Sequence, residues 1–419
     1  MGIVNHDLPF GHIEFCQVCG SKNLEKILDL GHQAPCDSLL TNRQLDEMEK
    51  TYPLHFVFCG DCGLAQIDYI VDPRILFYSE YPYRSGITKT LVDYLQAIAV
   101  SVVDSYKIDK NLLAVDIGSN DGTLLAGFQR VGMNVLGVEP TNIADLANER
   151  GVRTIKAFFG EEISTQIVKE YGKASVVTAT NMFAHVCNLG ELIRGVSGLL
   201  VDDGVFLTES HYLLDLVKTM QYDSIYHEHL KYYSLKPLIQ LFDYYDFSVV
   251  DAERIPNYGG SIRVVARKGR RWNKSARLEK LLKEEEDCEL YNVNTFYGFR
   301  NRVMEAKSDL RQLLVKLKSE GCQVPGVGCP GRSSTLINYC NIDSELMPYI
   351  AEQPTSLKIG MFLPGKHLPI VDEKRLFEDN PEYCVMLTWH YAEPIIKNLR
   401  NKGLKSKVII PLPEVKIVK

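Results

Sequence analysis

LLAVDIGSNDGTLL, residues 112–125, is the stretch that decides the fold. A short apolar run ends close to Asp116, a turn follows, and an apolar pattern of helical spacing begins. Gly118 and Gly122 lie in the turn, where residues that lack a Cβ allow a tight backbone path and a close approach to a ligand. This order predicts a strand, a turn and a helix that open a βαβ unit, with Asp116 at the carboxyl end of the strand, where such folds bind their ligands.

Glu139 closes the next apolar run, VLGVE, about 20 positions after the turn. At this distance the second strand of a βαβ unit commonly offers a carboxylate to a ribose. The glycines of the turn do not have the G-x-G-x-x-G spacing of nicotinamide and flavin sites. The acidic residue, the Gly-x-Asn-Asp-Gly turn and the distal glutamate are more similar to the adenosine-binding turn of Rossmann-like methyltransferases, although any α/β protein can contain a tight turn.

Bulk composition bounds the class of protein. The 419 residues are too many for one ordinary domain and predict two or three. Hydrophobic residues at 45% and charged residues at 24% are typical of soluble globular proteins, and a net charge of −6 argues against a nucleic-acid partner. The N-terminal residues lack the basic lead and apolar core of a signal peptide, and no apolar stretch is long enough to cross a bilayer. We therefore expect a cytoplasmic protein without a membrane partner.

Two C-x-x-C-G knuckles near the N-terminus predict a structural zinc site. They contribute Cys16, Cys19, Cys59 and Cys62. Four thiolates suit a closed tetrahedral zinc ion, whereas redox C-x-x-C pairs do not normally come doubled. Residues 1–75 are therefore expected to form a zinc-binding domain that is too small to be stable by core burial alone. Cys36 lies between the knuckles and is not expected to bind the zinc ion. The other six of the eleven cysteines are scattered along the chain, as is typical of reduced cytosolic thiols.

The segment 76–270 reads as a doubly covered parallel sheet. Residues 84–110 have the apolar spacing of a helix. The runs AVDIG, VLGVE, ASVVTAT and GVFLTES are strand-like and separated by helical stretches. Short strands that are apolar throughout belong to parallel sheets with helices on both faces. We therefore expect an α/β fold with a central Rossmann-like domain.

The segment 271–419 is expected to contain a helical connector and a second α/β domain. Residues 273–321 are rich in charge with apolar residues at helical spacing, which predicts one or two long helices. After them, the runs VPGVG, SLKIG, YCVMLTW and KVIIPLP alternate with helical patterns. This alternation is typical of a smaller Rossmann-like layer.

YDSIYHEHLKYYS, residues 222–234, holds the densest set of titratable groups. It comes directly after the loop of the presumed fifth strand, so Tyr226, His227, Glu228 and His229 are expected where a substrate would bind. The spacing of the two histidines does not match the H-E-x-x-H zinc motif. Histidine beside a carboxylate and a phenol suits proton abstraction near neutral pH. An aromatic helix with surface histidines is the alternative, and it explains the tyrosines but not the titratable groups.

Four further segments are candidates for ligand contact. Asn181-Met-Phe-Ala-His185 ends a strand, where Asn181 could touch the cofactor and His185 the reacting group; capping or core roles are the alternative. The loop with Tyr81 and Tyr83 could close over the site, although aromatic loops usually pack. The remaining candidates are the runs YGGSIR, which ends at Arg263, and PGRSST, with Arg332, Ser333 and Thr335. A helix start with an arginine suits a pyrophosphate, and ordinary turns and a helix cap are the alternative.

Taken together, these motifs resemble the zinc-containing sugar C-methyltransferases, which act on nucleotide-linked 4-keto-deoxysugars. The resemblance covers nearly the whole chain: the paired knuckles, D-x-G-S-N-D-G, N-x-F-A-H, Y-H-E-H and GGS-x-R. It implies a small zinc domain, a central methyltransferase domain and a C-terminal Rossmann-like domain that helps to hold the nucleotide sugar. The oligomeric state stays open between a monomer and a small homo-oligomer.

The resemblance also implies roles for individual residues. It places zinc on Cys16, Cys19, Cys59 and Cys62, and S-adenosylmethionine on Asp116, Gly118, Asn120, Gly122, Glu139 and Asn181. It implies His229 as the general base, supported by Tyr226 and Glu228, with His185 near the keto oxygen and Tyr81 or Tyr83 completing the pocket. Arg263, Arg332, Ser333 and Thr335 are the expected substrate contacts.

Two departures from the family pattern concern the substrate. The C-terminal turn of the family usually reads Ala-Lys-Gly-Asn before its threonine, where this chain has Pro-Gly-Arg-Ser-Ser before Thr335. The usual histidine ahead of Gly-Gly-Ser is Tyr258 here. The nucleotide, dTDP or GDP, therefore stays open, and carbon 3 beside a 4-ketone is the family-based methylation site. An O- or N-methyltransferase and a non-catalytic zinc-ribbon interaction protein are the alternatives.

Overall fold

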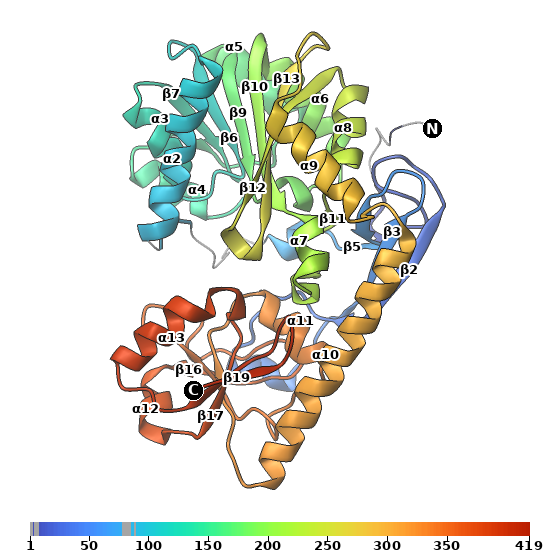
Figure 1. Cartoon of the computed structure of the whole chain (residues 1–419). Coiled ribbons are helices and arrows are strands. Elements are labelled where there is room, and N and C mark those ends of the chain that lie inside the picture. The colour runs from blue at the N-terminus through green and yellow to red at the C-terminus, as the bar shows by residue number, and fades with distance from the viewer. Residues whose placement is uncertain (1–2, 4–7, 78–84, 88) are drawn as a thin grey trace.

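The computed structural model describes residues 3, 8–77, 85–87 and 89–419. Figure 1 shows an N-terminal part in blue beside two α/β layers, with a long helix running along one side. The N-terminal strands are β1 (Gly11–His12), β2 (Leu24–Gln33), β3 (Tyr52–Cys59), β4 (Ala65–Ile67) and β5 (Tyr69–Ile70), followed by the short helix α1 (Pro73–Leu76). β2, β3 and β4 form an antiparallel sheet, and β4 also pairs with β11 (Lys231–Tyr232) from much later in the chain.

The central domain contains a seven-stranded sheet in the order β12-β13-β10-β9-β6-β7-β8. Its strands are β6 (Leu113–Ile117), β7 (Asn134–Val138), β8 (Thr154–Ile155), β9 (Ala174–Thr180), β10 (Leu200–His211), β12 (Phe247–Ile255) and β13 (Ser261–Lys268). Five neighbouring strands, in the order β10, β9, β6, β7 and β8, are parallel to one another. β13 runs antiparallel to both of its neighbours, β10 and β12. The four predicted parallel strands are thus confirmed.

Helices cover both faces of this sheet, which explains why its strands are apolar throughout. The helices are α2 (Lys89–Tyr106), α3 (Thr123–Arg130), α4 (Ile143–Glu149), α5 (Glu161–Tyr171), α6 (Leu189–Leu199), α7 (Leu213–Lys218) and α8 (Leu235–Tyr244). Ala114 belongs to the core that includes residues of α2 and α3, and the next residue, Val115, belongs to the core that includes residues of α6 and α8. Figure 1 shows α2 and α3 on one side of the sheet and α6 and α8 on the other. The predicted helix over 84–110 begins later, at Lys89, and ends at Tyr106.

The connector consists of two helices, α9 (Ala276–Asp287) and α10 (Val293–Ser319). The ring of Phe296 at the start of α10 stacks on Phe58 of the N-terminal sheet, with 4.4 Å between centroids. Further along, Leu310 and Leu314 are buried in the same core as residues of the C-terminal layer. α10 therefore joins the N-terminal part to the C-terminal layer (Figure 1). Within the described ranges, no helix combines the length and the apolar character that a bilayer crossing requires.

The C-terminal layer contains a six-stranded sheet in the order β16-β15-β14-β17-β18-β19. Its elements are β14 (Gly326–Val327), α11 (Arg332–Tyr339), β15 (Ile350–Glu352), β16 (Ile370–Asp372), α12 (Lys374–Asp379), β17 (Tyr383–Met386), α13 (Ala392–Asn401), β18 (Lys407–Ile410) and β19 (Lys416–Val418). The strands are parallel except for β19. The prediction of a strand at SLKIG is wrong: the segment forms turns that bring the ammonium of Lys358 to Asp37 (3.2 Å) and to the carbonyl of Cys329 (2.9 Å).

Candidate active site

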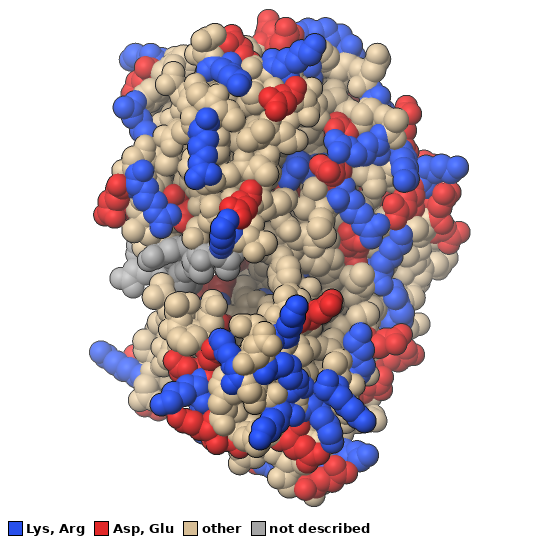
Figure 2. Space-filling view, turned by 60° about the vertical axis from the view of Figure 1, so that its left-hand side comes forward, with Lys and Arg blue, Asp and Glu red and all other residues tan. Residues whose placement is uncertain are grey.

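A cavity of about 660 Å³ lies between the central domain and the C-terminal layer. The space-filling view shows the surface hollowed between these two halves of the molecule (Figure 2). The carboxyl ends of the parallel strands β6, β7, β9 and β10 border the cavity from one side, and the β14–α11 turn and residues 352–358 border it from the other. The cavity therefore occupies the position in which open α/β sheets bind ligands.

Glu139 is fixed at the cofactor side of the cavity by its own neighbours. Its carboxylate accepts hydrogen bonds from the backbone N–H groups of Asn120 and Thr141, both at 3.0 Å, and from the Thr141 hydroxyl at 2.7 Å. Gly118, with φ of 69°, lies beside it, and a Cβ there would stand 3.0 Å from the side chain of Met182. The turn thus needs glycine at 118, and it presents a rigid carboxylate to the cavity.

Asp116 is buried at the same end of the cavity. It accepts a hydrogen bond from the Thr178 hydroxyl at 2.6 Å. Burial raises the pKa of Asp116 to about 7, and the neighbouring charge of Glu139 adds to this rise. Asn181 also borders the cavity. Its backbone adopts a left-handed conformation, with φ of 57°, and its N–H donates to the carbonyl of Glu209 at 2.8 Å. Gly122 is placed differently: it caps α3 with φ of 77° and lies outside the cavity lining.

His229 is arranged as a neutral base. Its Nδ1 lies 2.9 Å from the carbonyl oxygen of Ser224. Because a carbonyl oxygen can only accept, Nδ1 carries the proton and the lone pair of Nε2 stays available. Burial lowers the pKa of His229 well below its usual value, and the nearby His211 lowers it further. The imidazole is therefore unprotonated at neutral pH.

Aromatic rings surround His229 on several sides. The ring of Tyr226 lies 4.0 Å from it between centroids, that of His185 lies 5.1 Å away, and that of His211 lies 4.7 Å away. Phe77 stacks on the far side of His185 at 5.6 Å. Burial holds the pKa of His185 well below its usual value. The predicted trio of Tyr226, His185 and His229 is thus brought together in one wall of the cavity.

His211 also belongs to the cluster of rings around His229, and no sequence motif identifies it. It ends β10 and borders the cavity, and its imidazole forms no hydrogen bond with any residue that the structure describes. Burial lowers its pKa to about 3, and the positive charge of Arg332 contributes. Its position at the carboxyl end of a parallel strand is the sequence signal that could have identified it.

The other members of the YHEH run have separate surroundings. Glu228 borders the cavity and accepts a hydrogen bond from the Cys36 thiol at 3.7 Å. His227 does not border the cavity, which corrects the expectation that it lies near the substrate. Its Nε2 contacts the carbonyl of Pro53 at 3.1 Å and its ring packs on Tyr52, so it fastens the run to the N-terminal sheet.

The expected substrate contacts are only partly gathered at the cavity. Arg332 borders it, but its guanidinium pairs with both oxygens of Asp223, at 2.6 and 2.9 Å. Ser333 and Thr335 lie outside the lining, and their hydroxyls donate to the carbonyls of Pro330 (2.6 Å) and Ile225 (2.9 Å).

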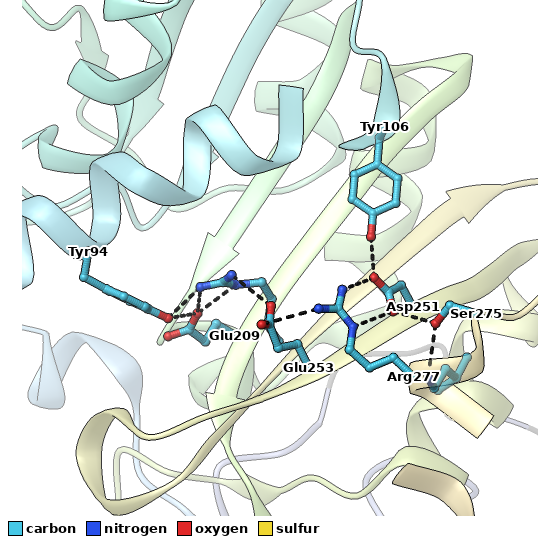
Figure 3. Close-up of polar contacts among 9 residues, drawn as sticks. Tyr94, Tyr106, Glu209, Asp251, Glu253, Ser275 and Arg277 are labelled. Atoms are coloured by element: carbon cyan, nitrogen blue, oxygen red, sulfur yellow. Dashed lines mark hydrogen bonds and ion pairs between the residues drawn. The ribbon is translucent and has the colours of Figure 1, made fainter. Parts of the chain in front are cut away.

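Arg263 lies away from the cavity as well. It pairs with the buried Glu209 at 3.1 Å and with the Tyr94 hydroxyl at 2.7 Å. Its partners Tyr94 and Glu209 belong to the polar network in Figure 3, which runs between α2, the sheet and α9. Tyr81 and Tyr83 lie outside the described residues.

The four knuckle cysteines form one buried cluster. All four sulfur atoms lie within 4.8 Å of one another, with Cys16 and Cys62 3.5 Å apart and Cys19 and Cys59 3.6 Å apart. Four thiolates at about 2.3 Å from a zinc ion would stand about 3.8 Å from each other. The cluster therefore fits a tetrahedral metal ion held by sulfur alone.

Comparisons with known proteins agree with this division of the chain. A family model described as the C-methyltransferase C-terminal domain matches residues 256–413, and one described as a methyltransferase domain matches residues 93–252. A third model, whose description proposes zinc binding, matches residues 16–77. The C-methyltransferase NovU from Streptomyces niveus is 31% identical over 412 residues, which cover 97% of each chain.

Solved structures resemble the chain more distantly. An S-adenosylmethionine-dependent methyltransferase from Clostridium acetobutylicum aligns with 12% identity and a TM-score of 0.34, covering 43% of this chain and 92% of its own. Magnesium protoporphyrin IX methyltransferase from Synechocystis aligns with 11% identity and a TM-score of 0.34, covering 45% and 90%. These scores carry no argument about the reaction. The full-length match to NovU does, and the chain belongs to the family of C-methyltransferases.

Proposed function

We propose that this C-methyltransferase transfers its methyl group to carbon 3 of a nucleotide-linked 4-keto-deoxysugar. A saturated sugar carbon has no lone pair, but a carbon beside a ketone can lose a proton and become an enolate. When bound, S-adenosylmethionine supplies an electrophilic methyl group for that carbon. Such a reaction needs a base and a partner for the keto oxygen within one cavity.

The single observation that carries the proposal is the proton arrangement of His229. The Nδ1–H group is committed to the carbonyl of Ser224, so Nε2 is the atom that accepts the proton from carbon 3. The lowered pKa keeps this atom unprotonated before each turnover. The imidazolium that forms is surrounded by neutral rings, so it readily gives its proton up again after the methyl group has moved.

Tyr226 and His185 are the candidates for the keto oxygen. Burial raises the pKa of Tyr226 well above its usual value, so its hydroxyl keeps its proton and can donate a hydrogen bond. His185 is neutral and carries one N–H group. Donors aimed at the oxygen stabilise the charge that develops on it as the enolate forms.

Other parts of the chain would bind the cofactor and the nucleotide or stabilise the fold. Asp116, Glu139 and Asn181 line the cofactor end of the same cavity, and we assign the adenosine ribose to Glu139. Zinc on the four thiolates would leave no open coordination position, so we assign it a structural role. The β14–α11 turn with Arg332 faces the cavity from the C-terminal layer, where the nucleotide of the substrate would lie.

The proposal is tested by offering the purified enzyme S-adenosylmethionine and a panel of 4-keto-deoxysugars linked to dTDP and to GDP. We expect one product with 14 mass units added, and proton–carbon correlation spectra should place the new methyl group on carbon 3. A methyl group on oxygen or nitrogen would overturn the enolate chemistry. A methyl group on another carbon would overturn the assigned position alone.

A further inference from the structure

The two Rossmann-like layers present the same strand–turn–strand arrangement to the cavity. In the central domain, Gly118 follows β6 with φ of 69°, and its N–H donates to the carbonyl of Val138, the last residue of β7, at 2.8 Å. In the C-terminal layer, Gly328 follows β14 with φ of 78°, and its N–H donates to the carbonyl of Ala351 in β15 at 2.8 Å. The two turns therefore leave their first strands in the same way.

Each turn is followed by an acidic residue at the end of the second strand. Glu139 comes directly after Val138, and Glu352 comes directly after Ala351. The carboxylate of Glu352 accepts from the N–H of Cys329 in the turn at 2.8 Å and from its own neighbour Gln353 at 2.9 Å. These two bonds match those that Glu139 accepts from Asn120 in its turn and from Thr141 nearby, both at 3.0 Å. Both carboxylates border the same cavity.

The glycines around the second turn strengthen the correspondence. Gly326, Gly328 and Gly331 have the G-x-G-x-x-G spacing, between a strand and a helix, that is typical of nucleotide sites. A Cβ at Gly328 would lie only 2.0 Å from the Thr388 hydroxyl, beyond the end of β17. The turn can therefore take this path only with glycine, as the first turn does beside Met182.

Glu352 keeps capacity for a ligand. A carboxylate offers about four acceptor positions, and the two backbone N–H groups occupy two of them. The neighbouring residues Gln353, Thr355 and Ser356 also border the cavity and offer polar groups. A carboxylate at this place in a Rossmann-like fold characteristically binds the hydroxyl groups of a ribose.

We propose that Glu352 binds the 2′ and 3′ hydroxyls of the nucleotide that carries the acceptor sugar, so that the enzyme selects ribonucleotides over 2′-deoxyribonucleotides. The inference deepens the proposed function, because it rests on a nucleotide-linked acceptor. Of the two nucleotides that the sequence left open, it favours GDP over dTDP. The base cluster around His229 would then lie between two ribose sites, one for the cofactor and one for the acceptor.

The test measures binding and needs no turnover. The full-length protein, saturated with S-adenosylhomocysteine, is titrated by calorimetry with the matched pairs GDP and dGDP, and UDP and dUDP. Losing one hydrogen bond to a charged acceptor weakens binding by about ten-fold or more. We expect that deficit for the deoxy member of any pair that binds, and we expect Glu352→Gln to bring the two members within about two-fold of each other.

A reciprocal variant serves as the control. Glu352→Gln should keep its affinity for S-adenosylhomocysteine, whereas Glu139→Gln should lose that affinity and keep the preference for the ribonucleotide. General damage to the turn would weaken both members of a pair alike, so the ratio reports ribose recognition specifically. Equal affinities in the wild-type enzyme, an unchanged ratio in Glu352→Gln, or no nucleotide binding at all would each overturn the inference. A clear ribose preference without methylation of any ketosugar would instead overturn the proposed function and leave this site standing.

Discussion

At the scale of single residues, the proposed chemistry depends on which nitrogen of His229 carries a proton. The Ser224 carbonyl decides this, because it can bind only an N–H group and therefore directs the lone pair to Nε2. A substitution can keep the N–H donor that binds the Ser224 carbonyl and remove the lone pair that accepts a proton. Asparagine still places an N–H donor near that carbonyl, but it offers no nitrogen that can act as a base.

We expect His229→Asn to lower kcat by about 100-fold or more, in the range attributed to general bases. The same variant should stop the exchange of the acceptor's carbon-bound hydrogen for deuterium in D₂O, followed by NMR in the presence of S-adenosylhomocysteine. Its affinity for S-adenosylmethionine, measured by calorimetry, should stay within about two-fold of wild type, since the cofactor contacts are elsewhere in the cavity. Exchange at the wild-type rate would remove His229 from the role of base.

Asp116 illustrates the cost of burying a carboxyl group at the cavity. Its native pKa is raised to about 7, so the native state holds this proton more tightly than the unfolded chain does. Stability is therefore highest below the unfolded pKa near 4 and is lost as the pH rises toward 7. Each pKa unit corresponds to about 1.4 kcal/mol, so the carboxylate lowers the free energy of unfolding by up to about 4 kcal/mol above pH 7.

Asp116→Asn should accordingly stabilise the cofactor-free protein more at pH 8 than at pH 5. The amide oxygen can still accept from the Thr178 hydroxyl, and no charge has to be buried. Urea midpoints at the two pH values measure the effect. A stabilisation that is equal at both pH values, or larger at pH 5, would contradict the assigned titration.

The residues of the site could be predicted from the sequence where they are concentrated in one run. YHEH identified His229 and its two neighbours because several titratable groups are adjacent in the chain. His211 and Glu352 are each isolated among ordinary neighbours, and only the three-dimensional ends of β10 and β15 bring them to the cavity. The charge of Arg263 suggests a contact with the substrate, but this side chain already pairs with the buried Glu209 on the neighbouring strand β10.

At the scale of elements, α2 is joined to the sheet by the polar network in Figure 3. The Tyr94 hydroxyl donates to Glu209 at 2.6 Å, and the Tyr106 hydroxyl donates to Asp251 at 2.7 Å. Behind them, Arg263 pairs with Glu209, and Arg277 pairs with Asp251. The network thus connects α2 to two strands of the sheet, and one of them, β10, ends at the cavity with Ser210 and His211.

The two arginines of this network should differ in their contribution to stability. The side chains of Arg263 and Glu209 are 11% and 0% exposed, whereas that of Arg277 is 50% exposed. Removing the cation from a buried pair leaves an uncompensated carboxylate, so Arg263→Met should cost about 3–5 kcal/mol. The matched variant Arg277→Met should cost about 1 kcal/mol or less, because water screens its pair. Denaturation in urea distinguishes them, and equal losses would contradict this argument.

Elements were predictable where hydrophobic periodicity decides them. The apolar strands β6, β7, β9 and β10 and the helices α9 and α10 follow directly from spacing. The failure at SLKIG comes from a tertiary contact: the run forms turns in which the half-buried Lys358 pairs with Asp37 in the N-terminal part. A partner 321 positions away in the chain leaves no trace in the local pattern.

At the scale of the whole molecule, the N-terminal sheet supports the active site directly. Residues 231–232 of the central domain add the strand β11 to β4, and the N–H of Ile67 donates to the carbonyl of Leu230 at 3.1 Å. The side chain of Gln17, which lies between the two cysteines of the first knuckle, donates to the same carbonyl at 3.2 Å. Because Leu230 follows His229, these contacts also hold the proposed base in place.

Removing zinc should therefore impair turnover and not only stability. We expect a strong chelator, or Cys59→Ser, to lower both the melting temperature and kcat, with a smaller effect on affinity for S-adenosylmethionine. Zinc content by atomic absorption, thermal unfolding and calorimetry measure the three quantities. A zinc-free protein with a wild-type kcat would contradict the supporting role, and Cys288→Ser, outside the cluster, is the matched control.

The three-part organisation could be expected from the order of motifs along the chain. The cavity between two of those parts could not, because its walls come from segments that are hundreds of positions apart. Contacts of that kind depend on how the layers are set against each other. The sequence pattern describes each layer alone.

α10 has a consequence for the size of molecule that the enzyme accepts. The helix is continuous over its 27 residues and packs against the N-terminal sheet near one end and the C-terminal layer toward the other. One added turn would lengthen it by about 5.4 Å and would carry Glu352 and Arg332 away from His229. Under the proposed function, the distance between the residues that hold the nucleotide and the proposed base therefore depends on the length of α10, which makes this helix the place to re-engineer the enzyme for longer acceptors.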